Sequence, residues 1–190
     1  QILGWRPEEL TGRPSDSLLH PDDVPQVIAL DRALRDGWMI ASSKEVMGDA
    51  KALSEKINAS EKWYKATLPT TVLGALVDAG EYKDIFVGKN LEKVPRARFE
   101  NTWWFRNTFT IDDFDAQKEQ LRLLVEGINY RANFWVNGKQ IATQDTLFGA
   151  FRQFDLDITQ AAKKGENTLL VEIFPPRSEE HTSELQSPDL

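Results

Sequence analysis

The sequence contains no cysteine and only two histidines, His20 and His181, one near each end. The lack of cysteine excludes disulfide bonds, thiol catalysis and thiolate metal sites. No imidazole lies between Pro21 and Glu180, which excludes Ser-His and Cys-His nucleophiles and ordinary zinc sites from the body of the chain. We therefore expect no cofactor and no metal, and a chemistry that depends on carboxylates, amides, arginines or aromatic rings.

Clustered positive charge and long apolar runs are also missing. The formal net charge is -7 at pH 7, and such a surface is repelled on average by nucleic acid and by anionic lipid. No run approaches the ~20 apolar residues that span a bilayer, and the first residues lack the pattern of a signal peptide. We expect neither nucleic acid nor a membrane as a partner. The compartment stays open, with a secreted or periplasmic bacterial parent as one alternative.

Residues 1–37 differ in character from the rest of the chain. Pro7 suits a first helical turn, Gly12 suits a helix end, and "HPDD" supplies capping carboxylates before an apolar period, so this part predicts a short helical segment. The motifs "LGWRPEELTG" and "HPDD" resemble a PAS sensory domain over residues 2–37. The resemblance implies a PAS-like fragment, either naturally fused or joined artificially. Capped surface helices without a sensory role are the alternative.

From Trp38 onward the pattern changes to short strands. The stretches are five to nine residues long, rich in aromatic and branched side chains and bounded by Gly, Asn or Asp, which predicts an all-β sandwich over residues 38–176. They read "WWFRNTFTI", "LRLLVEGI", "YRANFWVNG", "KQIATQ", "FRQFDLDIT" and "NTLLVEIF". One clear helix is expected near residues 70–80, between a Thr cap and Gly80.

The strongest local signal is Asn137-Gly138, which predicts a type I′ hairpin because both positions of that turn need a positive φ. Alternation in the preceding strand places Phe134 and Val136 on one face and Asn133 and Trp135 on the other. One face is expected to be core.

Five stretches taken in order resemble the N-terminal sugar-binding domain of glycoside hydrolase family 2. They are "WYKATLPTTVLGALVDAGEYKDIFVGKNLEKV", "WWFRNTF", "INYRANFWVNGKQIA", "GAFRQFDLDIT" and "GENTLLVEIFPP", and the wording is nearest to the β-mannosidase and exo-β-glucosaminidase branch. The resemblance implies a jelly-roll-like, galactose-binding-domain-like sandwich that packs against a separate (β/α)₈ barrel. It also implies a retaining glycosidase whose two catalytic glutamates lie on that barrel.

This chain is expected to contribute no catalytic residue. The acid of the family lies in an Asn-Glu pair, and the sequence contains no such dipeptide. Asp112, Asp113 and Asp115 follow "FTI", where such side chains cap turns. Asp155 and Asp157 alternate with apolar residues and point off the core. We expect all five carboxylates to be structural and solvated.

Three residues are candidates for sugar binding. The resemblance implies that the loop "YKDIFVGKN" reaches the rim of the barrel's active site, and Asn90 in it could both donate to and accept from a sugar hydroxyl. The family more often has prolines where this chain has Lys83 and Ile85, and Asn90 as a plain turn residue is the alternative. Adjacent Trp103 and Trp104 must point to opposite faces, so at most one lies in the core while the other meets solvent or another domain.

For these two tryptophans and for Trp135, packing between domains is the alternative to stacking against a sugar ring. Arg106 and Arg131 are expected to support these faces structurally.

The last residues, 177–190, show no apolar period. "RSEEHTSELQS" is what a common sequencing-library adapter encodes when it is read in frame, so we interpret this segment as a non-native, disordered tail. That interpretation favours a truncated glycoside hydrolase. A free-standing carbohydrate-binding module and a PAS-containing sensory protein are the alternatives.

Overall fold

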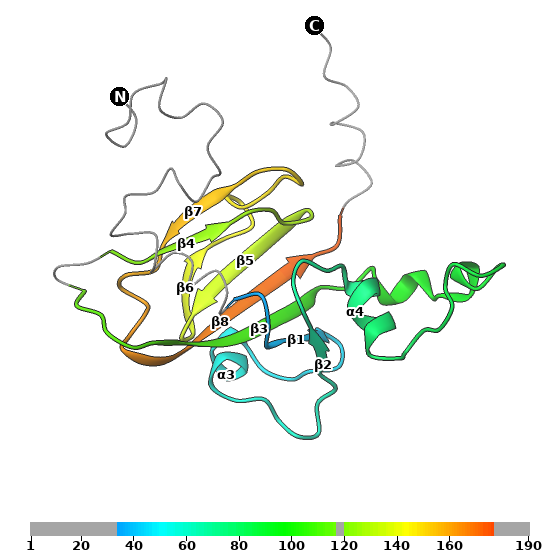
Figure 1. Cartoon of the computed structure of the whole chain (residues 1–190), viewed down its shortest axis with the longest axis horizontal. Helices are drawn as coiled ribbons and strands as arrows, with labels where there is room; N and C mark the ends of the chain where they lie inside the picture. The colour runs from blue at the N-terminus through cyan, green and yellow to red at the C-terminus, as the bar shows by residue number, and fades with distance from the viewer. Residues whose placement is uncertain (1–33, 117–119, 177–190) are drawn as a thin grey trace, which may run out of the picture.

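The computed structural model describes residues 34–116 and 120–176. Its centre is a six-stranded antiparallel sheet in the order β2-β1-β3-β8-β5-β6, and a two-stranded sheet, β4-β7, lies beside it (Figure 1). The strands are β1 (Trp38–Ser42), β2 (Tyr64–Ala66), β3 (Trp103–Ile111), β4 (Arg122–Val125), β5 (Arg131–Val136), β6 (Lys139–Ala142), β7 (Phe154–Asp157) and β8 (Gly165–Phe174). The expected all-β fold is confirmed for these residues.

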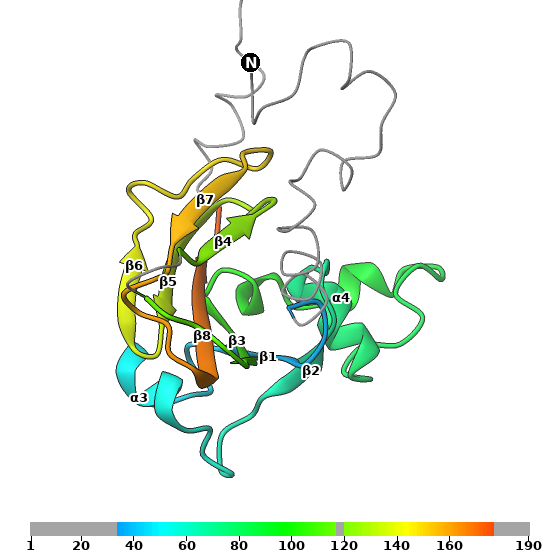
Figure 2. The same ribbon diagram turned by 60° about the vertical axis from the view of Figure 1, so that its left-hand side comes forward.

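The core lies between the two sheets. Alternate residues of β3 face it, and Phe105 and Phe109 are buried there with Leu169 and Val171 of the neighbouring β8. Leu123 of β4 closes the core from the smaller sheet. In both views β4 and β7 run over the β5–β6 side of the large sheet (Figures 1 and 2). Burial of this apolar surface is the main source of stability.

The hairpin between β5 and β6 follows the prediction. Asn137 and Gly138 have φ values of 51° and 76°. The half-buried Asn137 also makes a polar contact, because its Nδ2 donates to the Oδ1 of the buried Asn167 at 2.8 Å. Phe134 and Val136 face the core as expected. Trp135 lies on the opposite face.

We call the face of the large sheet that is turned away from β4–β7 its outer face. The short helix α3 (Ala50–Glu55) packs on this face. Asp49 caps it by accepting from the Ala52 N–H at 2.9 Å, and Leu53 packs against Trp104 and Leu170. Arg106 donates to the carbonyls of Leu53 and Ser54 at the other end. The sequence indicated only one clear helix after Trp38, and that count was wrong.

Helix α4 (Val72–Asp78) is the helix that the sequence predicted, with Thr71 as its cap and Gly80 at φ 80° just beyond its end. After it, residues 80–99 form what we call the arm, which contains two short 3₁₀ helices, η2 (Leu91–Lys93) and η3 (Arg96–Arg98). Ala75 and Leu76 of α4 are buried in the core, and in both views the arm extends away from the sheets beyond this helix (Figures 1 and 2).

The contacts of the sandwich extend to the first described residues. The amide of Asn107, buried on the core face of β3, donates to the Asp36 carbonyl at 2.7 Å, and Leu34 packs on the core. The expected PAS-like helices and the expected tail at 177–190 lie outside the described residues. Within the described ranges, no helix has the length and apolar character that crossing a membrane requires.

Candidate functional site

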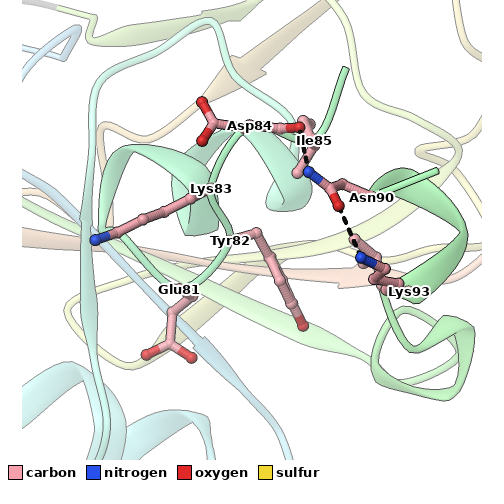
Figure 3. Close-up of a pocket in the computed structure, with 8 residues that line it drawn as sticks. Glu81, Tyr82, Lys83, Asp84, Ile85, Asn90 and Lys93 are labelled. Carbon is pink, nitrogen blue, oxygen red and sulfur yellow. Dashed lines mark hydrogen bonds between the residues drawn. The ribbon is translucent and has the colours of Figure 1, made fainter. Parts of the chain in front are cut away.

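The arm lines an open hollow of about 350 Å³, whose wall includes the predicted sugar-binding residue (Figure 3). Its lining combines both charge signs with one aromatic ring and two aliphatic side chains. The lining residues are Glu81, Tyr82, Lys83, Asp84, Ile85, Asn90, Lys93 and Val94. Such a mixture of donors, acceptors and apolar surface suits a polyhydroxylated ligand.

Asn90 sits where the arm turns into η2. Its Nδ2 donates to the Asp84 carbonyl at 3.1 Å, and its Oδ1 accepts from the Lys93 ammonium at 3.0 Å (Figure 3). An amide carries two N–H donors and two acceptor lone pairs. One donor and one lone pair are therefore left for a ligand, on a side chain whose orientation two contacts already fix.

Lys83 and Ile85, the two positions where the sequence of the arm differs from the one more usual in the family, have different surroundings. Ile85 is buried, with 6% of its surface exposed, and anchors the loop. Lys83 is exposed and lines the hollow. Asp84 between them has a φ of 49°, so the chain bends here without the prolines that the family more often has. Asn90 is thus both a turn residue and part of the hollow's wall.

The tip of the arm exposes large apolar side chains. Phe86 is 89% exposed, Val87 63% and Leu91 50%. Adjacent exposed apolar residues of this size on a projecting segment are typical of a surface that another domain or protein covers.

Arg98 ties the arm to the sheet. Its Nη1 donates to Glu81 Oε2 and to the Tyr82 hydroxyl, each at 3.2 Å, and its Nη2 donates to the Tyr64 hydroxyl on β2 and to Glu45 Oε1 at 3.4 Å. Hydrogen bonds from Lys62 and Arg98 lower the pKa of Glu81. The base of the arm is therefore held by a network of charged hydrogen bonds, while its tip stays exposed.

Trp103 and Trp104 point to opposite faces of β3, as predicted, and both are buried. Trp103 is 2% exposed and faces the core, where it lines a second, mainly apolar hollow of about 210 Å³. Trp104 is 8% exposed and lies under α3 against Trp135, with ring centroids 5.6 Å apart. The expectation that one of them meets solvent or another domain was wrong, because α3 of the same chain covers Trp104 on the outer face.

That burial favours packing over direct sugar stacking for Trp103 and Trp104, and their role in sugar binding stays a prediction. Arg106 supports the outer face as expected, and Arg131 lies on that face with its Nη1 on the Gln144 amide oxygen at 2.8 Å.

The aspartates occupy structural positions. Asp155 accepts from Arg122 Nε at 2.8 Å, Asp157 caps the Thr159 N–H at 2.9 Å, and Asp113 pairs with Lys164 at 3.1 Å. All three are exposed, as are Asp112 and Asp115. Among the described residues, no group of three or more His, Cys, Asp or Glu side chains is arranged to hold a metal ion.

The sequence predicted Asn90, which lines the hollow and whose role in sugar binding stays a prediction, but it gave no sign of the network around Arg98. Glu81, Tyr64 and Glu45 lie 17, 34 and 53 residues away from it. A pattern of neighbouring residues cannot reveal partners at such separations.

Comparison with known proteins identifies the domain. The family model described as "glycosyl hydrolase 2 galactose-binding domain-like" matches residues 50–189. An exo-β-D-glucosaminidase of Streptomyces avermitilis is 36% identical over 139 residues, which is 73% of this chain and 15% of that enzyme. The crystal structure of the exo-chitosanase CsxA of Amycolatopsis orientalis superposes with a TM-score of 0.68 at 32% identity, covering 75% of this chain and 16% of that one.

A β-D-mannosidase of Dictyoglomus thermophilum gives a TM-score of 0.58 at 25% identity over 81% of this chain and 17% of that one. The chain thus spans about one sixth of the length of these relatives. The family match begins at residue 50 and continues to residue 189, so it supports neither the PAS-like nor the adapter interpretation, and both stay predictions. The chain belongs to glycoside hydrolase family 2, as a member of its galactose-binding-like N-terminal domains.

Proposed function

We propose that this chain is the accessory sugar-binding domain of a longer retaining β-glycosidase that acts on β-linked glucosamine. The observation that carries the proposal is the arm, which presents Asn90 with one free donor and one free acceptor beside a hollow of about 350 Å³. The names of the exo-β-D-glucosaminidase relatives support the choice of sugar.

The arm would act at the rim of an active site that a catalytic barrel completes. Its exposed tip, Phe86 and Val87 above all, supplies apolar surface for docking on that barrel. Asn90 would then hold a sugar hydroxyl and orient the terminal residue of the substrate. Such orientation accelerates a reaction because the substrate loses its translational and rotational entropy on binding, so that this loss no longer adds to the barrier of the chemical step.

Bond cleavage is assigned to the barrel. A retaining mechanism needs two carboxyl groups ~5–5.5 Å apart, one protonated as the acid and one ionised as the nucleophile. The exposed aspartates of β7 are instead bound to Arg122 and Thr159. We therefore infer that the chain alone has no glycosidase activity.

Two experiments test this proposal. The 190-residue chain is assayed on an aryl β-D-glucosaminide, with no turnover expected, and clear turnover would refute the assignment of catalysis to another domain. Amplification of the source locus is expected to give a reading frame that continues into a barrel with an Asn-Glu pair. A frame without a barrel would favour a free-standing carbohydrate-binding module instead.

A further inference from the structure

The outer face of the large sheet carries a carboxylate among aromatic and amide side chains. Glu172 on β8 is the register partner of Trp104 on β3 and of Asn133 on β5. Side chains at paired positions point to the same face of a sheet. Its neighbours in sequence, Val171 and Ile173, face the core.

Glu172 is half-buried and held in place by an amide. Asn133 Nδ2 donates to Glu172 Oε2 at 2.8 Å, and Asn133 Oδ1 accepts from the Gln144 N–H at 2.7 Å. Burial raises the pKa of Glu172, and the hydrogen bond from Asn133 opposes this rise. Within the described parts of the chain, no Lys or Arg forms an ion pair with Glu172.

Two indole rings lie on the same face of the sheet as this carboxylate, one of them at its paired position on β3. Trp104 and Trp135 lie 5.6 Å apart between ring centroids, inclined by 49°. Trp135 is two residues from Asn133 on the same face and, unlike the buried Trp104, is only half-buried. Apolar C–H faces of a pyranose ring pack on such surfaces, while polar groups at the edge of the ring find hydrogen-bonding partners.

We propose that this outer face binds a protonated glucosamine unit of a β-linked glucosamine oligomer, with the ammonium on Glu172 and the sugar ring against Trp135. The choice of sugar rests on the proposed function, whereas the position of the site rests on the side chains of β5 and β8. The site is separate from the hollow of the arm.

Charge favours this ligand over a neutral sugar. A half-buried carboxylate without a cationic partner loses hydration when a neutral ring covers it, but gains a charge-assisted hydrogen bond when an ammonium does. The net charge of -7 also attracts a polycationic oligomer. An N-acetylated oligomer has the same ring without the charge, so it should bind much more weakly.

The test is a titration of the whole chain with a glucosamine tetramer and with its N-acetylated counterpart, followed by calorimetry and by indole fluorescence. We expect binding of the glucosamine tetramer and at least about tenfold weaker binding of the acetylated one, since a lost hydrogen bond to a charged group changes affinity by this order. Glu172→Gln, which keeps the shape and the contact with Asn133, should also lose about tenfold.

Glu166→Gln is the matched control. Glu166 is an exposed residue on the same strand and the same face as Glu172. Its replacement by glutamine changes the net charge by the same amount as Glu172→Gln does. The Glu166→Gln variant should bind the glucosamine tetramer as the parent does.

Trp135→Phe should weaken binding of the glucosamine tetramer severalfold. Circular dichroism checks that the Glu172→Gln, Glu166→Gln and Trp135→Phe variants are folded.

Three outcomes would overturn the inference: equal binding of the acetylated tetramer, equal binding by Glu172→Gln, or no binding by the parent. If Asn90→Ala abolishes binding and Glu172→Gln does not, the oligomer binds at the arm, and this site is rejected while the proposed function stands. Turnover by the chain alone would instead reject the proposed function without bearing on the outer face.

Discussion

Replacement of Arg98 by alanine should loosen the arm and destabilise the whole domain. The guanidinium donates to two carboxylates and two phenol hydroxyls, and its side chain is 21% exposed. Partly exposed ion pairs contribute ~0.2–1 kcal/mol each, and hydrogen bonds to a charged group ~1.5–3 kcal/mol. These contributions are not additive, because all four contacts share one side chain.

One partner makes the loss more costly. Glu45 Oε2 is buried without a hydrogen bond to any described residue, and the other oxygen of the same carboxylate accepts from Arg98. Removal of the guanidinium leaves that charge without a counter-ion. We therefore expect Arg98→Ala to lower the free energy of unfolding by about 2–3 kcal/mol, and Arg98→Lys by about half as much, because an ammonium cannot reproduce the planar fork.

Urea unfolding measures the total effect, and hydrogen exchange locates it. Backbone amides of the arm, such as Phe99 N–H on the Arg96 carbonyl, should exchange faster, while those of β3 and β8 change only with global stability. Arg96→Ala is the control, since Arg96 is exposed and forms no ion pair with a described residue. A loss below about 0.5 kcal/mol in Arg98→Ala, or unchanged exchange in the arm, would refute the reasoning.

Three further predictions concern the sheet and its helix. Leu53→Ala should lower the free energy of unfolding by about 3 kcal/mol in urea titrations, because Leu53 of α3 is 1% exposed and packs on Trp104 and Leu170. A loss under about 1 kcal/mol would show that the packing of α3 on these two residues contributes little to stability. Gly138→Ala should cost about 1–2 kcal/mol by the same assay, because φ is 76° there, and a neutral result would reject the type I′ turn. Glu172→Gln should be more stable than the parent at pH 7, because the raised pKa of Glu172 means that stability falls as the pH rises through that pKa. The advantage should vanish below about pH 4, where the carboxyl is protonated in both states, and an advantage that persists in acid would contradict the assigned cause.

The sequence predicted the elements that local patterns determine. The aromatic and branched side chains of the short stretches "WWFRNTFTI" and "NTLLVEIF" predicted β3 and β8, and the Thr cap with Gly80 predicted α4. Helix α3 escaped prediction because six residues are too few for an apolar period. Its stability comes from packing on Trp104, which is a tertiary contact.

The candidate site shows the same division. Asn90 could be predicted as a sugar contact from the sequence of its loop. The orientation of its side chain depends on hydrogen bonds to Asp84 and Lys93, which the folded arm brings into contact with it. The burial of Trp104 likewise depends on a helix 50 residues earlier that strand alternation cannot reveal. Long-range packing decides which residues of a predicted set remain accessible.

A domain exchange tests the central claim most directly. The segment of the Amycolatopsis orientalis exo-chitosanase that matches this chain is replaced by residues 34–176, and hydrolysis of p-nitrophenyl β-D-glucosaminide, a ligand of that enzyme, is measured. We predict an active chimera in which Asn90→Ala lowers kcat/KM about tenfold, while Arg96→Ala does not. A folded chimera without activity, or an active one indifferent to Asn90→Ala, would contradict the claim that the arm of this domain serves a glycosidase active site.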